Sequence, residues 1–412
     1  MTTIDAEYPI VVIGAGQAGF ELCAKLRLLG ITEPIALIGD EDAPPYQRPP
    51  LSKAYLLGDL ELERLFFQPH SFYEAENIDL RTGCSCISVD RDRKTITLSD
   101  ASVLGYKTLV FATGAAPIRL PDAIGGNLKK VHYVRTLKDA DAIAEDFKPG
   151  KHALIIGGGY IGLEAAAVAS GLGMKVTLVE ATDRILARVA APETSTFFRD
   201  LHTSHGVDLR EGVKLVRLIG EEGSVTGAVL SDGTELKLDV AVVGIGIRPN
   251  QILAETAGLE CENGIKVDAQ LRSSDPNIFA IGDCASFPYR DARIRLESVG
   301  NAIDQAQTVA NVMTGKASSY AAKPWFWSDQ YDVKLQIVGL STGYDRIVTR
   351  GHSGGPLSYW YYADDKLLAV DAINDPRAYM VAKRLIENGK TANPETVADI
   401  GSDLKTLLNK DA

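Results

Sequence analysis

The chain has 412 residues, 45% of them apolar and 24% charged, a composition typical of a globular protein with two or three domains. Its formal net charge of −11 argues against a general nucleic-acid binder, and no run approaches the roughly 20 apolar residues that span a bilayer. The N-terminus lacks the basic and apolar regions of a signal peptide, so we expect no membrane association and a cytoplasmic location.

The first forty residues carry a βαβ pattern. An apolar run at 8–13 is typical of a strand buried on both faces, and leucines with helical spacing at 17–29 and a second apolar strand at 35–38 follow it. Between the first strand and the helix, three glycines form G-x-G-x-x-G: Gly14, Gly16 and Gly19. Such glycines allow a tight turn, the approach of a pyrophosphate and close helix–strand packing. With acidic Asp40 just past the second strand, they predict a dinucleotide site.

The same pattern begins again about 143 positions later. A strand, a helix and a second strand are expected at 152–156, 160–172 and 175–180, and the glycines are Gly157, Gly159 and Gly162. Glu180 ends the second strand, where a carboxylate accepts both ribose hydroxyls and repels a 2′-phosphate, which favours NADH over NADPH. Arg184 would favour NADPH, but we interpret it as a surface arginine on the following helix.

Glycines also end three further strands. These strand ends are Ala112-Thr113-Gly114, Gly244-Ile245-Gly246 and Gly282-Asp283. After residue 319 aromatic residues cluster, and strand-like segments alternate with a helix at 376–388. This tail indicates a small α+β domain.

The chain has five cysteines, Cys23, Cys84, Cys86, Cys261 and Cys284. Cys84 and Cys86 lie two apart in an expected strand, too far apart along an extended backbone for an easy disulfide. We interpret all five as scattered reduced thiols, since none has the C-x-x-C spacing of a redox pair. Their spacing also does not suit an iron–sulfur cluster, and the six histidines show no pairing that indicates a metal site or a general base.

Two dinucleotide sites in one chain indicate a hydride relay. A nicotinamide delivers two electrons at once, whereas a flavin can accept them together and release them singly. We therefore expect one site to hold a flavin and the other a nicotinamide.

The order of the glycine motifs resembles that of the glutathione-reductase-like flavoproteins with FAD and NAD sites. Longer motifs narrow the resemblance: Arg48-Pro-Pro-Leu-Ser-Lys53, Gly157-Gly-Gly-Tyr-Ile-Gly-Leu-Glu164, Leu296-Glu-Ser-Val299 and Pro324-Trp-Phe-Trp-Ser-Asp-Gln-Tyr331. They are similar to motifs of the NADH-dependent ferredoxin reductases of bacterial oxygenase systems, and the likeness runs nearly end to end. It implies an α/β fold of two Rossmann-like domains and a small α+β C-terminal domain.

The resemblance also implies three domains and two cofactor sites. FAD would be bound by a discontinuous domain, 1–113 and 250–322, and NADH by 114–249, with a C-terminal domain at 323–412. The implied FAD contacts are Gly14, Gly16, Ala18, Gly19, Asp40, Arg48, Lys53, Cys86, Thr113, Gly114, Arg135, Gly282, Asp283, Val299 and Trp327. The implied NADH contacts are Gly157, Gly159, Tyr160, Ile161, Gly162, Glu180 and Gly246.

The implied reaction is hydride transfer from NADH to FAD, followed by single-electron transfers to a [2Fe–2S] ferredoxin that supplies an oxygenase. Lys53 would lie beside the flavin with Glu164 as its ion-pair partner, stabilising the reduced cofactor electrostatically. The alternative is a purely structural ion pair between domains. Trp327 either lines the electron path or, as aromatic runs usually do, packs in a core.

Two other functions remain open at this point. An NADH oxidase or peroxidase would need a catalytic cysteine near the flavin, where Ser52 stands instead. A flavoprotein of the apoptosis-inducing-factor type would be switched by NADH and have a long inserted or basic C-terminal region.

A ferredoxin partner is usually acidic and would dock on a cluster of basic residues. The two candidate clusters are Arg290, Arg293 and Arg295, and Lys334, Arg346 and Arg350. The alternative is that these charges are simply solvated.

Overall fold

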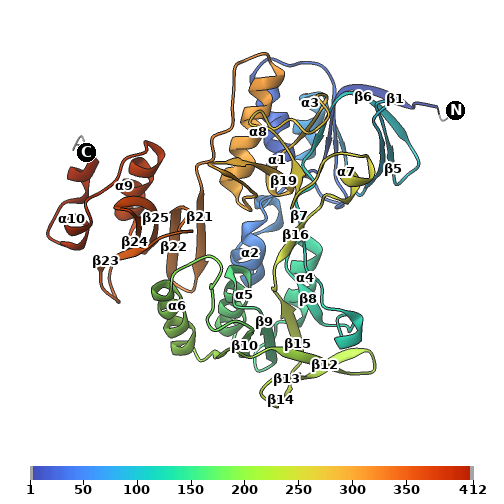
Figure 1. The fold of residues 1–412 in the computed structure, drawn as a ribbon. Helices are drawn as coiled ribbons and strands as arrows, with labels where there is room; N and C mark the ends of the chain where they lie inside the picture. The colour runs from blue at the N-terminus through green and yellow to red at the C-terminus, as the bar shows by residue number, and fades with distance from the viewer. Residues whose placement is uncertain (1–2, 409–412) are drawn as a thin grey trace. The chain divides into compact units, whose positions relative to one another are not determined.

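A computed structural model describes residues 3–408 and separates the chain into two compact units (Figure 1). The first unit comprises 1–48, 61–116 and 247–322, and the second comprises 49–60, 117–246 and 323–412. Within the described residues, no helix combines the length and the apolar character that crossing a bilayer requires.

The first unit is built on a seven-stranded sheet in the order β3-β2-β1-β6-β5-β4, with β18 paired to β6. β1 pairs in parallel with both β2 and β6, whereas β4 and β5 form an antiparallel extension. Parallel neighbours need a crossover, which α1 (Gln17–Leu28) supplies. The strands are β1 (Ala6–Ile13), β2 (Ile35–Ile38), β3 (Ile78–Arg81), β4 (Cys86–Asp90), β5 (Thr95–Leu98), β6 (Val103–Phe111) and β18 (Ile278–Ala280).

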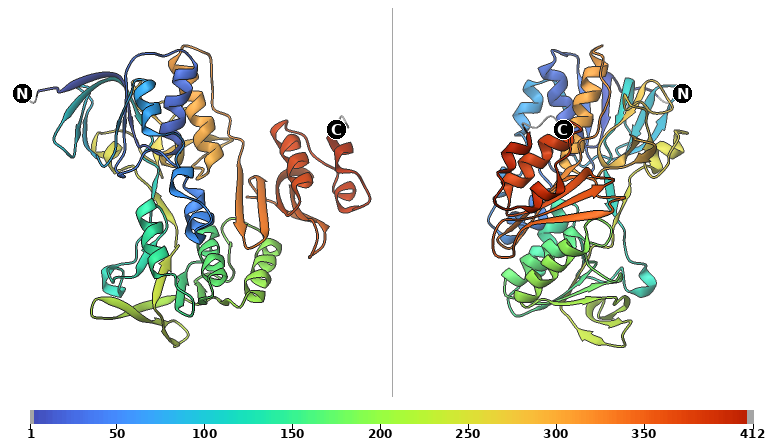
Figure 2. Two further views of the ribbon diagram at one scale, coloured as in Figure 1. Left: turned by 180° about the vertical axis from the view of Figure 1, so that it is seen from behind. Right: turned by 60° about the vertical axis from the view of Figure 1, so that its left-hand side comes forward.

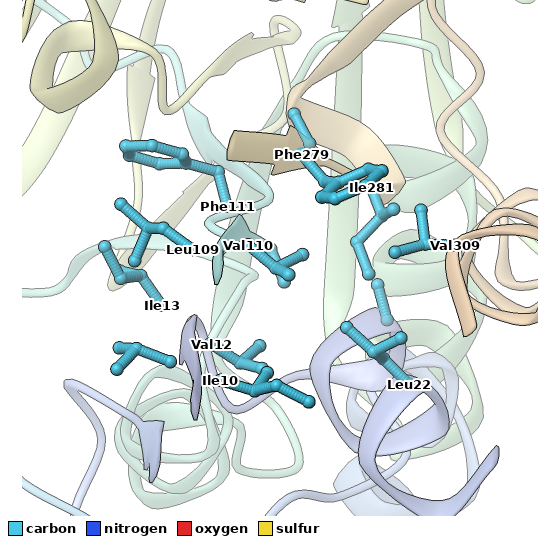
Figure 3. Packing of buried hydrophobic residues seen from close by; sticks show 14 of the residues in the cluster. Ile10, Val12, Ile13, Leu22, Leu109, Val110, Phe111, Phe279, Ile281 and Val309 are labelled. Atoms are coloured by element: carbon cyan, nitrogen blue, oxygen red, sulfur yellow. The ribbon is translucent and has the colours of Figure 1, made fainter. Parts of the chain in front are cut away.

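The core of the first unit lies between this sheet and two helices. α1 and α8 (Val299–Met313) pack side by side, blue and orange in Figure 2. Ile10 and Val12 of β1 pack with Leu22 of α1, all fully or almost fully buried (Figure 3). The other elements are η2 (Leu62–Arg64), α3 (His70–Ala75), β7 (Ala115–Pro117), β16 (Ile247–Pro249), α7 (Ile252–Thr256), β17 (Ile265–Lys266), η4 (Gly282–Cys284), β19 (Ala285–Tyr289) and β20 (Ala292–Ile294).

The second unit contains a parallel sheet in the order β11-β10-β9-β15-β8. α5 (Tyr160–Gly171) joins β9 to β10 and is apolar on nearly all sides, as expected for a buried helix. The strands are β8 (Val131–Tyr133), β9 (His152–Ile156), β10 (Lys175–Glu180), β11 (Asp208–Glu211) and β15 (Val240–Val243), beside an antiparallel sheet of β12 (Leu215–Glu221), β13 (Ser224–Leu230) and β14 (Glu235–Lys237). The remaining elements are η1 (Pro49–Ser52), α2 (Ala54–Leu57), η3 (Asp122–Ile124), α4 (Leu137–Asp146) and α6 (Pro192–Ser204).

The C-terminal part of the second unit is an antiparallel sheet in the order β21-β22-β25-β24-β23. Alternation along β24 sends Trp360 and Tyr362 into one core cluster with α9, and Tyr359 and Tyr361 into another cluster with α5 and α6. The elements are β21 (Trp325–Gln330), β22 (Val333–Gly339), β23 (Arg346–Gly351), β24 (Leu357–Ala363), β25 (Lys366–Ile373), α9 (Pro376–Glu387), α10 (Pro394–Ala398) and η5 (Leu404–Leu408).

The predicted fold class, α/β with two dinucleotide-binding folds and a small α+β C-terminal part, is confirmed. The expectation that Cys84 lies in a strand with Cys86 is wrong, because β4 begins only at Cys86. The three-domain division stays a prediction. Residues 49–60, assigned to the FAD domain from the sequence, group in the structure with the second unit, as does 323–412.

A buried carboxylate joins β25 to α6 inside the second unit. Asp371 accepts hydrogen bonds from the Tyr361 hydroxyl at 2.5 Å and the Thr194 hydroxyl at 2.7 Å. Burial raises the pKa of Asp371 to about 6, against the lowering effect of these two hydrogen bonds. Since the carboxyl binds protons more tightly in the folded protein, its charged form lowers stability as pH rises.

We therefore expect Asp371→Asn to change how stability depends on pH. The wild-type protein should lose roughly 3 kcal/mol of unfolding free energy between about pH 4 and pH 6 through this group, and the variant should not. The difference in unfolding free energy between the two proteins, measured by urea unfolding, should change by that amount across the window. Asp200→Asn, an exposed change on α6, should leave the difference flat. A flat difference for Asp371→Asn would contradict the assignment.

Candidate functional site

The first glycine loop lies between β1 and α1. Gly14 has a φ of +115°, and a Cβ there would lie 2.2 Å from the Ala112 carbonyl oxygen. A Cβ at Gly19 would lie 2.0 Å from the Gly14 carbonyl oxygen. By contrast, apart from chain neighbours, no described residue has an atom within 4 Å of a Cβ placed at Gly16. The outer glycines thus serve the turn and the helix–strand packing, whereas the middle glycine faces open space.

The second glycine loop, between β9 and α5, has the same division. Gly157 has a φ of +108°, and a Cβ there would lie 2.4 Å from the Gly244 carbonyl oxygen. A Cβ at Gly162 would lie 2.0 Å from the Gly157 carbonyl oxygen, but within the described part of the chain nothing crowds Gly159. Tyr160 and Ile161 are the first two residues of α5, and Ile161 is exposed.

Both loops fit a dinucleotide pyrophosphate. The N-caps of α1 and α5 are the middle glycines Gly16 and Gly159, and neither gives its helix a side-chain cap among the described residues. The first N–H groups of each helix are therefore directed at the open space beside the middle glycine, where an anion is stabilised. The residues present fit such a group in both units.

Glu180 holds the second loop in place. Its Oε2 accepts the Gly158 N–H at 2.7 Å, and its Oε1 accepts the N–H of Thr182 at 2.7 Å and its hydroxyl at 2.8 Å. Oε2 has a further lone pair, so Glu180 can still accept from a ribose hydroxyl there. Gly246, with a φ of +119°, follows β15 in the same unit.

Arg184 does not lie on a helix, and this expectation is wrong. It lies in the loop between β10 and α6, half-buried, because its guanidinium serves the loop itself. It donates to the Ala190 carbonyl at 2.9 Å, the Ser195 hydroxyl at 2.6 Å and the Ala187 carbonyl at 3.2 Å. The guanidinium is thus engaged in local structure rather than held out for a 2′-phosphate.

The other predicted FAD residues are divided between the units. Those in the first unit are Ala18, Asp40, Arg48, Cys86, Thr113, Gly114, Gly282, Asp283 and Val299. Most of them follow a strand end or lie in the first turn of a helix, but Cys86 begins β4 and Arg48 directly precedes η1. Lys53, Arg135 and Trp327 belong to the second unit.

Within the first unit the structure adds two residues that the sequence did not single out. Glu41 forms an ion pair with Arg48 at 2.5 Å, whereas Asp40 is exposed. Gln305 accepts the Gly282 N–H at 2.7 Å. An acidic residue next to Asp40 was a visible signal, but the contact of Gln305 was not, because Gln305 lies in the middle of α8.

Lys53 and Glu164 form a buried ion pair inside the second unit. The ammonium lies 2.8 Å from Glu164 Oε2, and the two side chains are 16% and 4% exposed. The hydroxyls of Ser52 and Ser328 each donate to the carboxylate at 2.6 Å, the first to Oε2 and the second to Oε1. The predicted pairing of Lys53 with Glu164 is therefore present, and two serines complete it.

The aromatic run lies on β21, an edge strand of the C-terminal sheet. Phe326 packs against Tyr160 of α5, with ring centroids 4.7 Å apart. Trp327, half-buried, stacks on Trp325 at 5.5 Å on the other face of the strand. The role of Trp327 in electron transfer stays a prediction.

Three of the expected basic docking residues are used internally. Arg293 donates to the carbonyls of Val267 and Ser286, and Arg295 donates to the Asp283 carbonyl and forms an ion pair with Glu297. Arg350 of the other cluster donates to four carbonyl groups, those of Val397, Asp399, Ile400 and Ser402. These three arginines are therefore removed from the two clusters that were predicted as basic docking patches.

Four of the five thiols are poor nucleophiles. Burial raises the pKa of Cys23 and of Cys86 to about 12 and that of Cys261 to about 11, and it raises the pKa of Cys284 as well. These four are protonated at neutral pH, whereas the thiolate is the reactive form. The five cysteines are unpaired, and no group that could hold a metal ion was found among the described residues.

Comparisons with known proteins agree with this geometry. Residues 8–306 match the family model of the pyridine nucleotide-disulphide oxidoreductases, and 325–408 match a reductase C-terminal domain. The chain is 44% identical to a ferredoxin–NAD(P)+ reductase from Sphingomonas sp. over 93% of this chain and 94% of that protein. It is 41% identical to putidaredoxin reductase from Pseudomonas putida, over 98% of both. The crystal structure of a covalent putidaredoxin reductase–putidaredoxin complex superposes with a TM-score of 0.95, at 40% identity and 99% coverage of both chains.

Proposed function

The chain belongs to the pyridine nucleotide-disulphide oxidoreductases, and we propose that within this family it is an FAD-dependent NADH:ferredoxin oxidoreductase. It would take a hydride from NADH and pass single electrons to a [2Fe–2S] ferredoxin that supplies an oxygenase. A bound flavin supplies the conversion between these two modes of electron transfer. We also propose a cytoplasmic location.

The observation that carries the proposal is the pair of glycine loops with one geometry. Each unit has a strand–loop–helix turn whose middle glycine faces open space at an uncapped helix N-terminus. Two such sites suit two dinucleotides, and we assign FAD to the loop of Gly14, Gly16 and Gly19. NADH is assigned to the loop of Gly157, Gly159 and Gly162, because Glu180 stands beside it.

We assign Lys53 and Glu164 the task of stabilising the reduced cofactor. An ammonium that is largely out of water exerts a stronger field than one in solvent, and the Glu164 carboxylate offsets the cost of burying it. Hydride transfer itself needs no general base. The proposal therefore gives these two residues an electrostatic role and no proton transfer.

The electron acceptor is proposed to be a separate protein. The chain has only five cysteines, without the spacing that holds an iron–sulfur cluster, so electrons must leave it. A ferredoxin acceptor is supported by the likeness to a ferredoxin–NAD(P)+ reductase and to the reductase in the putidaredoxin complex. The rival peroxidase function is disfavoured because four of the thiols are held protonated.

Anaerobic stopped-flow spectroscopy tests this function. The purified flavoprotein is mixed first with NADH and then with candidate [2Fe–2S] ferredoxins, and the flavin and ferredoxin absorbances are followed. We expect rapid flavin reduction and then ferredoxin reduction that is faster than reoxidation by oxygen. Slow reduction by NADH, or no ferredoxin that outruns oxygen, would show that the proposal is wrong.

Glu180→Arg is expected to weaken NADH binding by about 10- to 100-fold. The change removes the acceptor for the ribose hydroxyls and for the Gly158 N–H, and a lost charged hydrogen bond costs about 1.5 to 3 kcal/mol. The Kd of NADH is measured by fluorescence titration. Glu180→Gln keeps an acceptor and should lose less, which separates ligand contact from loop damage. Unchanged NADH affinity in the arginine variant would contradict the specificity argument.

A further inference from the structure

A row of buried polar side chains leads away from Glu164 through the second unit. Alternate residues of β21 face α5 and α6, so Phe326, Ser328 and Gln330 share one side of the strand. On α5, Tyr160 and Glu164 lie one turn apart and meet Phe326 and Ser328 respectively. Gln330, next along β21, meets His202 of α6. Glu164, Ser328, Gln330 and His202 are each no more than 4% exposed.

These side chains form one continuous hydrogen-bond chain. Ser328 Oγ lies 2.6 Å from Glu164 Oε1, and Gln330 Nε2 lies 3.1 Å from Ser328 Oγ. His202 Nε2 lies 2.8 Å from Gln330 Oε1, and the Tyr331 hydroxyl lies 3.3 Å from His202 Nδ1.

The carboxylate determines the direction of each bond as far as His202. Glu164, paired with the Lys53 ammonium, can only accept, so the single hydroxyl hydrogen of Ser328 points at it. Ser328 then offers Gln330 only lone pairs, so the Gln330 amide must present its NH2 group to Ser328 and its oxygen to His202. A carbonyl oxygen cannot donate, so His202 must carry its hydrogen on Nε2.

We propose that Ser328 and Gln330 are positioning residues, which hold Glu164 and thereby Lys53 through a hydrogen-bond chain with one fixed direction. Polar groups aligned in this way polarise one another in a low-dielectric interior. The Tyr331 hydroxyl can donate to His202 Nδ1 only when the imidazole is neutral. Burial, only partly opposed by the bond to Gln330, lowers the pKa of His202 to about 4. The positioning role of Ser328 and Gln330 rests on the proposed role of Lys53 and Glu164, whereas the hydrogen-bond chain itself does not.

The chain is tested by nuclear magnetic resonance of protein labelled with 15N-histidine, with His202→Gln used for assignment. We expect His202 to be neutral at pH 7 with its hydrogen on Nε2, exchanging slowly with solvent. Ser328→Ala, two hydrogen bonds away, should speed that exchange about tenfold or shift the tautomer. Ser358→Ala is the matched control, because Ser358 is equally buried in the same sheet and instead accepts from Trp360. An unchanged His202 signal in Ser328→Ala would overturn the inference.

The positioning role is tested by the midpoint potential of the bound flavin, which does not depend on turnover. Lys53→Met should make the potential more negative, and Ser328→Ala and Gln330→Met should shift it the same way by less, with no shift in Ser358→Ala. A shift in Lys53→Met alone would overturn the positioning role. No shift in Lys53→Met would instead refute the proposed electrostatic role of Lys53. The nuclear magnetic resonance measurement on His202 would then be the test of the hydrogen-bond chain.

Discussion

Gly159→Val is expected to abolish reduction by NADH while leaving the protein folded and loaded with flavin. No described residue beyond the chain neighbours comes within 4 Å of a Cβ at Gly159, so the β-carbon of a valine meets no protein atom there. Gly159 has a φ of −80° and a ψ of 177°, an extended conformation that valine adopts readily. The isopropyl group would instead occupy the space assigned to the pyrophosphate. We expect NADH affinity to fall at least about 100-fold, or roughly 2.7 kcal/mol.

Two further variants make this test specific. Gly16→Val should have the complementary effect in the first unit, with loss of FAD from a folded protein, because the space at Gly16 is equally open. Gly162→Ala should instead lower stability, because its Cβ would lie 2.0 Å from the Gly157 carbonyl oxygen. Flavin content is read from the visible spectrum, NADH binding from titration and folding from circular dichroism. Wild-type NADH affinity in Gly159→Val would exclude the second loop as the pyrophosphate site.

Glu164→Leu is expected to lower the unfolding free energy by about 3 to 5 kcal/mol, the cost of leaving a buried charge without its partner. The Lys53 side chain is only 16% exposed, and the hydroxyls of Ser52 and Ser328 would lose their acceptor as well. Urea unfolding measures the loss. Glu145→Leu, an exposed change on α4, should stay within about 0.5 kcal/mol of the wild type.

The double variant Lys53→Met with Glu164→Leu separates the charge from the packing. Removing both partners leaves no unpaired charge, so most of the stability lost in Glu164→Leu should return. The hydroxyls of Ser52 and Ser328 would still lack their acceptor, so recovery should be incomplete. If the double variant were as unstable as the sum of the two single variants, the two side chains would not be energetically coupled.

The sequence alone was sufficient for the two βαβ units and their glycine loops. This information is local, because each fingerprint lies within about thirty residues and the apolar runs before and after it are contiguous in the chain. The glycines of both loops have the division of tasks that the spacing predicts. The fold class followed from the same local patterns.

Residue environments that depend on distant segments were not accessible in the same way. Arg184, Arg293 and Arg295 read as surface charges in the sequence, but each donates to backbone carbonyls that folding brings to it. Asp40 stays a predicted ribose contact, but nothing in the local pattern indicates that its neighbour Glu41 pairs with Arg48. No periodicity records which carbonyl or carboxylate a long side chain will meet.

The two glycine fingerprints are therefore what the sequence itself determined about this protein, since a turn, a helix start and an open middle position are set by residues a few places apart. The surroundings of Glu164 were decided only by the tertiary structure. Its serine partners come from positions 112 residues before it and 164 residues after it in the chain. A buried carboxylate needs donors from every side, and only the packing of α5 against β21 and η1 determines which residues supply them.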